Sequence, residues 1–582
     1  MKDLRRLAHY FRPHRRYLIL AALLVLVETA FELFIPVLMA TLIDEGVANG
    51  DIPLMLHQGI LMGLFALISL ITGFLQARYA ARASYGFGAD LRRAQYEAVQ
   101  KLAFSNLDHF ETSSLVTRMT TDVTVLQNAF NTGFRAVFRS PVMLLMGLGL
   151  SFYMSPPLAV IFFLCVPVLA VILWAIVRKV APSYRVLQKA VDRMNNVVQE
   201  HLTAMRAVKA FVREDYAAER FETVNGGLMD ASRYTFKTAV LSTPAFQMTM
   251  YGATVLLLWF GGSMILDGKL EVGQLTGFLS YVMQVMNSLM LVANVFLLLT
   301  RSLASCHRIL EVLDEVPVID NPANAITEVA DGSIDFDDVS FRYSADAKTD
   351  ALSHVDLHIR SGQTVGILGG TGAAKTTLVQ LIPRLYDVTG GALRVGGRDV
   401  RDYELHTLRE AVGIVLQKNV LFSGTVRENL QWGNPDATDE ELWDACRTAC
   451  ADEFLQRMPR GLDSDLGQGG VNVSGGQKQR LCIARALLKS PKILIFDDST
   501  SAVDMATEAK IRTALAQRRD VTKLIIAQRI TSVQNADVIV ILDDGKIHAV
   551  GNHDTLLAGD PIYQEIYHSQ VKGGDGHGQT HQ

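Results

Sequence analysis

The sequence is poor in cysteine and in charged residues, and each shortage excludes a class of protein. Its five cysteines are spread through 582 residues and none of them forms a CxxC pair. This spacing excludes a disulfide framework and gives no indication of a zinc site. Charged residues make up only 20% of the chain, and the formal net charge is −4. The basic surplus that is typical of nucleic-acid binding is therefore missing.

Charge is missing altogether from four long stretches of the chain. They are residues 52–77, 140–177, 240–266 and 272–300. A bilayer core about 30 Å thick is crossed by about 20 apolar helical residues, so each stretch can span it. The Ser-Pro-Pro sequence at 155–157 predicts a turn that divides the second stretch into two helices. With a further span that contains Glu28 and Glu32, the sequence predicts six transmembrane helices, at about 17–43, 55–80, 136–155, 157–178, 240–266 and 273–300.

Lysine and arginine are concentrated at the N-terminus and in the segments 78–139 and 178–239. The positive-inside rule then places these segments and both termini in the cytoplasm. Both long segments have helical periodicity, so we expect the membrane helices to continue into the cytoplasm and to turn near residues 109–123 and 211–221.

The first sixteen residues form a basic, amphipathic segment. Leu4, Leu7, Ala8 and Phe11 recur at helical spacing on one face. We expect this elbow helix, 1–16, to lie in the membrane interface before the first span.

The pattern changes after about Asp320, where short apolar strands begin to alternate with helices. This alternation predicts an α/β domain with a largely parallel sheet. The expected organisation is a transmembrane domain at 17–310, a linker at 311–332 and the α/β domain at 333–572. The polar tail 573–582 is expected to be disordered, and its two histidines are a weak metal signal.

A glycine-rich loop follows the predicted strand at 363–369 and precedes a helix that is expected to begin at Lys375. It approximates the phosphate-loop pattern, in which successive N–H groups and a lysine surround phosphate oxygens. Alone, the same pattern is also compatible with an ordinary strand–helix turn. The loop consists of Gly369, Gly370, Thr371, Gly372, Ala373, Ala374, Lys375, Thr376 and Thr377.

Two further motifs accompany the loop. A buried strand ends in Asp497 and Asp498, where one carboxylate can hold Mg²⁺ and the other can face an attacking water. A second motif consists of Val473 followed by Ser474, Gly475, Gly476 and Gln477. With these three motifs in this order, the chain resembles the ATP-binding cassette (ABC) family, whose signature is Leu-Ser-Gly-Gly-Gln.

The resemblance covers nearly the whole chain and implies a half-size ABC exporter. Its fold would be an all-α six-helix transmembrane domain with long cytoplasmic extensions, followed by an α/β P-loop NTPase domain. The cofactors implied are ATP and Mg²⁺, with Thr376, Gln417 and Asp497 at the metal. Tyr343 then matches the residue that stacks on adenine, and 501–504 match the D-loop. The turns near 108–115 and 213–220 match the coupling helices.

The chain departs from the usual exporter pattern at four positions. Asp498 stands where a catalytic glutamate is usual, and Gln528 stands where the switch histidine is usual. Aspartate is one methylene shorter than glutamate, and glutamine carries neither a proton nor a charge. Ala374 replaces a loop glycine, and Gln468 replaces a frequent glutamate. Drift without consequence is one interpretation; the other is a site that binds ATP and hydrolyses it slowly.

ABC cassettes work as head-to-tail pairs, so the resemblance implies a division of labour. This chain would lend its Ser474–Gln477 stretch to a second half-transporter that carries the intact glutamate and histidine. Such a pair resembles a heterodimeric multidrug exporter of the cytoplasmic (inner) membrane, which moves hydrophobic or amphiphilic compounds. Two alternatives stay open: a homodimeric lipid or drug exporter that uses Asp498, and a nucleotide-gated channel or regulator.

Four polar residues inside the predicted spans are candidates for contact with the substrate. Glu28 and Glu32 lie one helical turn apart, and ionisable groups in a bilayer are costly. They would attract cationic amphiphiles or line a wet cavity. Alternatively, Glu28 would be paired to a polar neighbour within the bundle and Glu32 would lie nearer the outer surface. Gln284 and Asn287 lie among methionines in the sixth span, and adaptable methionine surfaces suit varied ligands. Ordinary helix packing is the alternative for this second pair.

Overall fold

The computed structural model describes residues 2–344, 346–498 and 504–575. The chain divides into two compact units. The helical unit comprises Met1–Gln100 and Thr112–Glu315, and the cassette unit comprises Lys101–Glu111 and Val316–Gln582. A short stretch between two membrane helices therefore belongs to the second unit.

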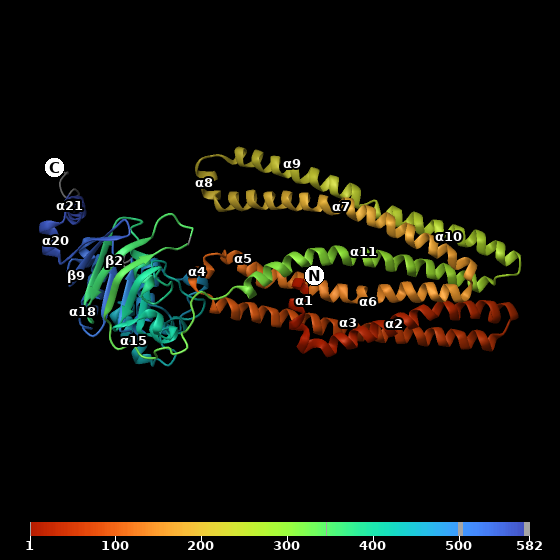
Figure 1. Ribbon diagram of the computed structural model, residues 1–582, viewed down its shortest axis with the longest axis horizontal. Coiled ribbons are helices and arrows are strands. Elements are labelled where there is room, and N and C mark those ends of the chain that lie inside the picture. Colours follow the sequence, from red (N-terminus) through yellow and green to blue (C-terminus); the bar gives the residue numbers. More distant parts are fainter. Residues whose placement is uncertain (1, 345, 499–503, 576–582) are drawn as a thin grey trace. The chain divides into compact units, whose positions relative to one another are not determined.

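The helical unit contains the six predicted spans. Among the described residues, six helices are long and apolar enough to cross a membrane, which confirms that prediction. The principal helices are α2 (Arg15–Thr41), α3 (Ile52–Lys101), α6 (Val123–Met154), α7 (Pro156–Thr203), α9 (Glu214–Ala239), α10 (Ser242–Leu266) and α11 (Val272–Asp314). Figure 1 shows α6 beside α11 and α7 beside α9.

Several of these helices are much longer than a bilayer requires. The helix α3 has 50 residues and α7 has 48, so each extends about 70 Å at 1.5 Å per residue. The prediction that membrane helices continue beyond the bilayer is confirmed. Ser155 is extended and Pro156 begins α7, because a proline at the first helical position loses no hydrogen bond.

The positions expected for the two distant turns are wrong by a few residues. The short helices there are α4 (Phe104–Leu107) and α8 (Met205–Ala210), which precede the expected stretches. At α4 the Asn106 side chain accepts a 3.3 Å hydrogen bond from the backbone of Ala103, which closes the turn early. Helix resumes at α5 (Thr112–Thr117), and α6 follows after the short helix Arg118–Asp122.

The N-terminal segment packs into protein. It forms α1 (Lys2–Leu7) and a 3₁₀ helix (Ala8–His14). Leu7 and Phe11 are buried, and the Phe11 ring stacks on Phe87 of α3 at 4.0 Å. Ala8 is exposed. Leu7 and Phe11, which were expected to face the membrane interface, contribute instead to a core shared with α3, α6 and α11.

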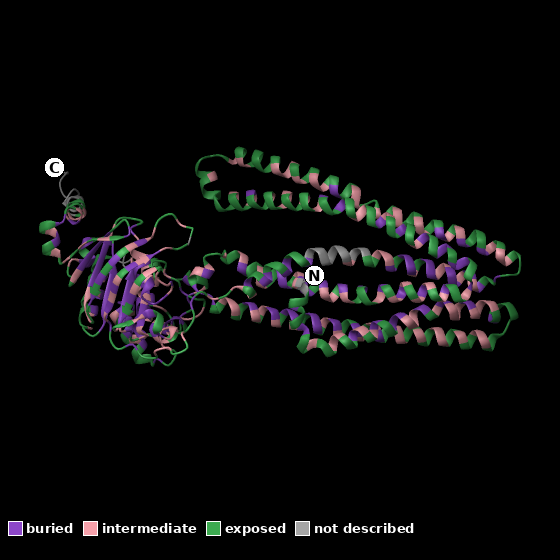
Figure 2. Ribbon diagram, in the orientation of Figure 1, coloured by how far each residue is buried: buried purple, intermediate pink, exposed green. Residues whose placement is uncertain are grey.

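The cassette unit contains two sheets. The larger has the order β10-β9-β3-β8-β7-β6 and is parallel except at the β10–β9 pair. Its strands are β3 (Thr364–Gly369), β6 (Val412–Val415), β7 (Ile493–Asp497), β8 (Thr522–Ile526), β9 (Val538–Asp543) and β10 (Lys546–Gly551). Every residue of β7 and β8 is buried, as expected for central parallel strands covered on both faces (Figure 2).

The smaller sheet is antiparallel, with the order β2-β1-β4-β5. It consists of β1 (Ile334–Phe341), β2 (Leu352–Ile359), β4 (Gly390–Val395) and β5 (Arg398–Asp399). The sequence predicted the largely parallel sheet but did not distinguish this antiparallel one from it. The alternation of buried and exposed residues in β2, such as buried Val355 beside exposed Asp356, is typical of an antiparallel strand.

Helices cover the parallel sheet of the cassette unit. They are α12 (Lys375–Leu381), α13 (Leu405–Ala411), α14 (Val426–Leu430), α15 (Asp439–Thr448), α16 (Asp452–Leu455), α17 (Gly475–Leu488), α18 (Met505–Ala516), α19 (Ile530–Val533), α20 (His553–Gly559) and α21 (Pro561–Asp575). The helix expected to begin at Lys375 is confirmed as α12. All five cysteines are buried and free, which agrees with the absence of a disulfide framework.

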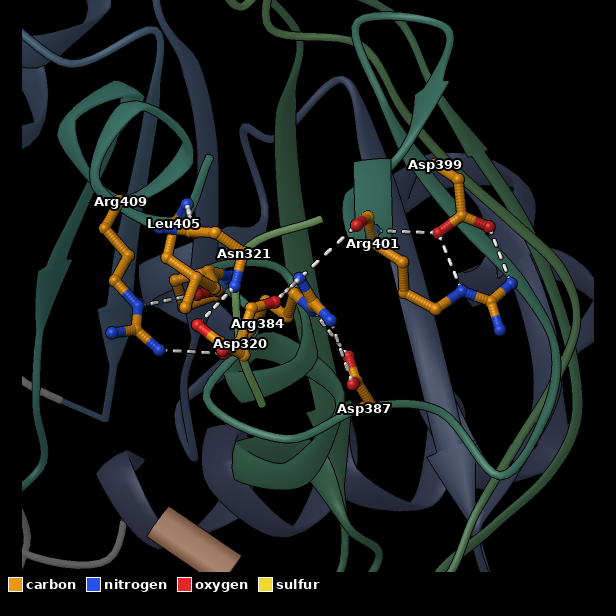
Figure 3. Close-up of polar contacts among 9 residues, drawn as sticks. Asp320, Asn321, Arg384, Asp387, Asp399, Arg401, Leu405 and Arg409 are labelled. Carbon is orange, nitrogen blue, oxygen red and sulfur yellow. Dashed lines mark hydrogen bonds and ion pairs between the residues drawn. The ribbon is translucent and has the colours of Figure 1, made fainter. Parts of the chain in front are cut away.

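The segment that follows α11 is fastened to the cassette by a polar cluster around Arg384 (Figure 3). Arg384, buried to 6% exposure, donates at 2.7 Å to Asp387 and at 3.4 Å to the backbone oxygen of Asp320. The Asn321 side chain accepts at 2.8 Å from the backbone of Leu405. These contacts hold Asp320 and Asn321 against the segments that contain Arg384 and Leu405.

The predicted disordered tail is only partly within the described residues. The helix α21 continues to Asp575, so the tail begins later than residue 573. Residues 576–582, including both histidines, lie outside the described part of the chain.

Candidate functional site

A cavity of about 760 Å³ opens at the carboxyl ends of β3, β7 and β8. Parallel α/β sheets bind ligands at this edge because their loops and helix N-termini converge there. The cavity is lined by most of the residues that the sequence singled out. They are Tyr343, Gly369, Gly370, Thr371, Gly372, Ala373, Ala374, Lys375, Thr376, Thr377, Gln417, Asp497, Asp498 and Gln528.

The loop between β3 and α12 has a strained position. Ala374 has φ +66° and ψ +24°, in the left-handed region that glycine tolerates best. For an L-residue this conformation costs roughly 1–2 kcal/mol. Lys375 donates to the carbonyl oxygens of Gly369 and Gly370 at 2.9 and 2.7 Å. Its ammonium group therefore lies inside the curve of the loop.

The residues at the end of β7 form an oxygen donor set that suits Mg²⁺. The Thr376 hydroxyl donates to Oδ1 of Asp497 at 2.8 Å. Burial raises the pKa of Asp497, the Thr376 hydrogen bond opposes this shift, and the nearby Asp498 adds to it. Burial lowers the pKa of Lys375, against the attraction of both aspartates. A divalent cation would relieve the repulsion between the two carboxylates, so these residues fit the metal.

The two residues that replace the usual glutamate and histidine contact each other. The side-chain amide of Gln528 donates to Oδ2 of Asp498 at 2.6 Å. Asp498 has φ +44°, so its backbone is also left-handed. Gln570 of α21 binds the backbone on both sides of Arg529. Its side-chain amide donates to the Gln528 carbonyl oxygen, and its side-chain oxygen accepts from the Ile530 N–H, both at 2.9 Å. Nothing in the sequence pointed to Gln570.

Tyr343 stands at the rim of the cavity and is half exposed. Its hydroxyl lies 2.8 Å from that of Thr377, and its ring packs edge-on against Tyr386 at 5.3 Å. Tyr386 in turn donates to Asp108, next to α4, at 2.8 Å. Burial raises the pKa of Tyr386, and Asp108 raises it further. Nothing in the sequence selected Tyr386, because its partners lie far away along the chain.

The Ser-Gly-Gly-Gln stretch does not line this cavity. Ser474 caps α17: its hydroxyl accepts from the Gln477 backbone, and the Gln477 side chain accepts from the Ser474 backbone at 2.9 Å. Gly475 and Gly476 form the first turn, at the positive end of the helix dipole; Gly475 is exposed and Gly476 is partly buried. Of the predicted D-loop, residues 501–503 lie outside the described part of the chain, and Asp504 caps α18.

In the helical unit both membrane glutamates have arginine partners that sequence reasoning missed. Arg135 donates to Glu28 at 2.5 Å, and Arg139 donates to Glu28 at 3.2 Å and to Glu32 at 2.6 Å. Glu28 is therefore paired within the bundle, which agrees with the second interpretation, and Glu32 lines a cavity. Glu28 is 5% exposed.

Comparison with known proteins covers both units. The family described as "ABC transporter transmembrane region" matches residues 18–289, and that described as "ABC transporter" matches residues 352–501. The chain is 36% identical to the uncharacterized ABC transporter ATP-binding protein YfiB of Bacillus subtilis, over 96% of this chain and 97% of that protein.

Two further relatives have more specific names. The chain is 30% identical to the putative multidrug export ATP-binding/permease protein YgaD of Bacillus subtilis and 32% identical to the ATP-dependent lipid A-core flippase of Desulfotalea psychrophila. Both alignments cover 97% of this chain and 99% of the relative. A bacterial Atm1-family ABC exporter with ATP bound has the same fold, with a TM-score of 0.82 at 24% identity over 96% of this chain and 99% of that one.

Proposed function

Because this chain belongs to the ABC transporter family, as a half-size exporter with one cassette, we propose that it is the slow-hydrolysing subunit of a heterodimeric exporter. It is an ATPase-coupled, multi-pass membrane protein that binds ATP with Mg²⁺. Its own ATP site would hydrolyse slowly, and the site that carries the partner's catalytic residues would perform most of the hydrolysis. Its location would be the cytoplasmic membrane, with both termini and the cassette in the cytoplasm. The proposed substrates are hydrophobic or amphiphilic compounds.

The observation that carries the proposal is the hydrogen bond from Gln528 to Asp498. A general base must reach its water within about 2.6–3.2 Å. Asp498 is one methylene shorter than glutamate, and the Gln528 amide occupies one of its carboxylate oxygens at 2.6 Å. Gln528 has no proton to exchange. Both substituted residues therefore favour holding a nucleotide over splitting it.

The proposed role of each residue follows from its place in the structure. Tyr343 would stack on adenine, the loop 369–377 would surround the phosphates, and Thr376, Gln417 and Asp497 would hold Mg²⁺. The bound metal would supply charge neutralisation at the phosphates. The capped Ser474–Gln477 stretch does not line the cavity of its own chain. We propose that it completes the site of a partner that carries the intact glutamate and histidine.

The substrate is proposed to cross at the surface formed by α2, α6 and α11. Glu32, Gln284 and Asn287 line a cavity there, and Glu28 lies behind it. The names of two relatives, a multidrug export protein and a lipid A-core flippase, support a hydrophobic or lipid-like cargo. A homodimeric exporter that hydrolyses ATP through Asp498 is the second candidate. The carboxylate of Asp498 lines the nucleotide cavity, and this position favours that alternative.

One experiment separates the two. The full-length chain is purified alone and together with a half-transporter that carries glutamate and histidine at the corresponding positions, and ATP hydrolysis is measured. We expect turnover only with the partner. Ser474→Ala in this chain should abolish that turnover, and Asp498→Asn should leave most of it. Rapid hydrolysis by the chain alone that Asp498→Asn removes would establish the homodimer instead. Ion conductance without turnover in either form would support a channel or regulator.

A further inference from the structure

A second cavity, of about 360 Å³, lies in the helical unit between α2, α6 and α11. Its volume is within the range of small-molecule sites. Its apolar lining includes Met143 and Leu291. Its polar lining consists of Glu32, Thr132, Arg135, Arg139, Gln284, Asn287 and Ser288.

The charges of this lining favour an anion. Glu28 is 7% exposed by its side chain and does not line the cavity, whereas the Arg135 side chain is 46% exposed and does. Arg139 is 17% exposed and is divided between Glu28 and Glu32. Two guanidinium groups and one carboxylate therefore face the space, with Glu32 already bound to Arg139. The two arginines balance Glu28 and Glu32 in charge, but the most buried side chain of the four is Glu28 and the most exposed is Arg135, so a ligand meets guanidinium donors first.

Arg135 has donors to spare. A guanidinium group carries five N–H donors in a planar fork, and within the described part of the chain Arg135 has one recorded partner, Glu28 at 2.5 Å. A pair that served only to neutralise Glu28 would be sealed from the cavity. The open face of Arg135 instead has the geometry that binds carboxylate or phosphate oxygens in a bidentate manner.

The amides on α11 complete a polar end to the cavity. Oε1 of Gln284 is buried and has no recorded hydrogen-bond partner in the described residues, while Ser288 already donates to the Val285 carbonyl at 2.7 Å. The Gln284 oxygen can only accept a hydrogen bond, so the donors available to an anion from these side chains are the amide N–H groups of Gln284 and Asn287. Met143 and Leu291 provide apolar contact beside these groups.

We propose that this cavity binds the anionic head group of an amphiphile, a carboxylate or a phosphate ester, on Arg135. The inference rests on the proposed function, that is, on this chain being an exporter of amphiphiles, and it names their charge. It reverses the expectation of a cationic substrate, because the arginine partners cancel both glutamates. The alkyl portion lies against Met143 and Leu291.

The test uses the full chain in phosphatidylcholine nanodiscs and three fluorescent probes with one alkyl chain. The probes are 11-(dansylamino)undecanoic acid, 11-(dansylamino)undecanol and N-dansyl-1,11-diaminoundecane, and empty nanodiscs give the background. We expect the acid to bind about tenfold tighter than the alcohol, since a hydrogen bond to a charged group contributes about 1.5–3 kcal/mol. The amine should bind most weakly. The inference is overturned if the amine binds tightest.

Variants then assign the preference to Arg135. Arg135→Gln should remove the preference for the acid, and Arg135→Lys should keep part of it. Arg178→Gln is the matched control, because Arg178 packs over Trp174 of α7 and does not line the cavity. The double variant Glu28→Gln with Arg135→Gln removes the carboxylate together with its arginine, so neither charge is left without its partner. It should also lose the preference for the acid. A preference that survives in both the single and the double variant would contradict the assignment.

Two further measurements identify the source of the anion and keep the two proposals separate. If phosphatidylglycerol added to the nanodisc competes with the acid, the head group is that of a lipid; if it does not, the head group is that of a soluble amphiphile, and both results support an anion site. ATP binding reports on folding of every variant. If the unmodified chain shows no preference for the acid but hydrolyses ATP only with the partner, the anion site alone is overturned. If it prefers the acid but its hydrolysis does not depend on the partner, the proposed function alone is overturned.

Discussion

The hydroxyl of Tyr386 donates a 2.8 Å hydrogen bond to the carboxylate of Asp108. Asp108 follows α4, which lies between two membrane helices in the sequence, and the other side of Tyr386 packs on Tyr343 at the nucleotide cavity. Phe104 of α4 also lies 6.1 Å from the Tyr386 ring. Tyr386 thus joins the cavity rim to a segment contributed by the membrane part of the chain.

We predict that Tyr386→Phe uncouples transport from nucleotide binding. The ring contact with Tyr343 remains, so ATP affinity should change less than about threefold, while the loss of a hydrogen bond to a charged group weakens the link to α4 by about 1.5–3 kcal/mol. Stimulation of ATP hydrolysis by a transported compound, measured with the partner present, should fall. Tyr403→Phe is the control, because its hydroxyl binds the Val395 carbonyl inside the cassette. Normal stimulation in Tyr386→Phe would refute the link.

Ala374→Gly should slightly stabilise the cassette. The left-handed backbone at Ala374 costs roughly 1–2 kcal/mol in the folded chain, and glycine adopts it freely. Part of this gain is offset by the greater freedom of glycine in the unfolded chain, about 0.4–1 kcal/mol. Because both effects act on the free energy of unfolding, we expect a small rise in the thermal unfolding temperature and an unchanged Kd for a fluorescent ATP analogue. Ala373→Gly should give no gain, because Ala373 is not among the positive-φ residues.

Restoring both substituted residues should increase hydrolysis at the chain's own site. Asp498→Glu lengthens the side chain by one methylene, and Gln528→His replaces the amide that binds the carboxylate. A positioned base contributes about 10²–10⁴-fold to such reactions, so we expect at least a tenfold rise in ATP turnover of the double variant. Adding Lys375→Ala to it should abolish the gain. An unchanged rate would mean that the two departures do not limit the site.

Arg139 should matter more for stability than Arg135. Arg139 binds both Glu28 and Glu32, whereas Glu28 keeps Arg139 when Arg135 is lost. Breaking a buried ion pair typically costs about 3–5 kcal/mol, and Arg139→Gln should approach the lower figure. Thermal unfolding in nanodiscs measures the difference. The double variant Arg139→Gln with Glu32→Gln should recover part of the loss, and additive effects would argue against the pairing.

Mg²⁺-dependent nucleotide binding should weaken on acidification, beginning above the ordinary pKa of an aspartate. The pKa of Asp497 is raised above 3.8 by burial, and Mg²⁺ requires the ionised form. A carboxyl group with a higher pKa in the folded chain than in the unfolded chain makes the folded state less stable as the pH rises from the unfolded to the folded pKa. A bound cation relieves that cost. Binding of a fluorescent ATP analogue across the pH range measures this effect. The same titration in EDTA should not show this loss.

The sequence by itself determined the number of spans and the phosphate loop. Both depend on neighbouring residues: an uncharged run long enough for a bilayer, and a strand, a glycine-rich turn and Lys375 in immediate succession. The parallel strands were also predictable from their apolar runs. The antiparallel sheet was not, because β1 pairs with β2 and β4, and such pairing depends on register between separate segments.

The tertiary structure alone decided which side chains meet. Gln528 lies 30 positions from Asp498, and Arg139 lies 107 from Glu32. Periodicity gives a helix its apolar face, but its rotation against a neighbour is set by packing along the whole interface. That rotation brings Arg135 and Arg139 to the two glutamates and changes the expected charge of the membrane cavity. The backbone of Ala374 was likewise set by the curve of its loop, since the sequence shows the residue and not its φ.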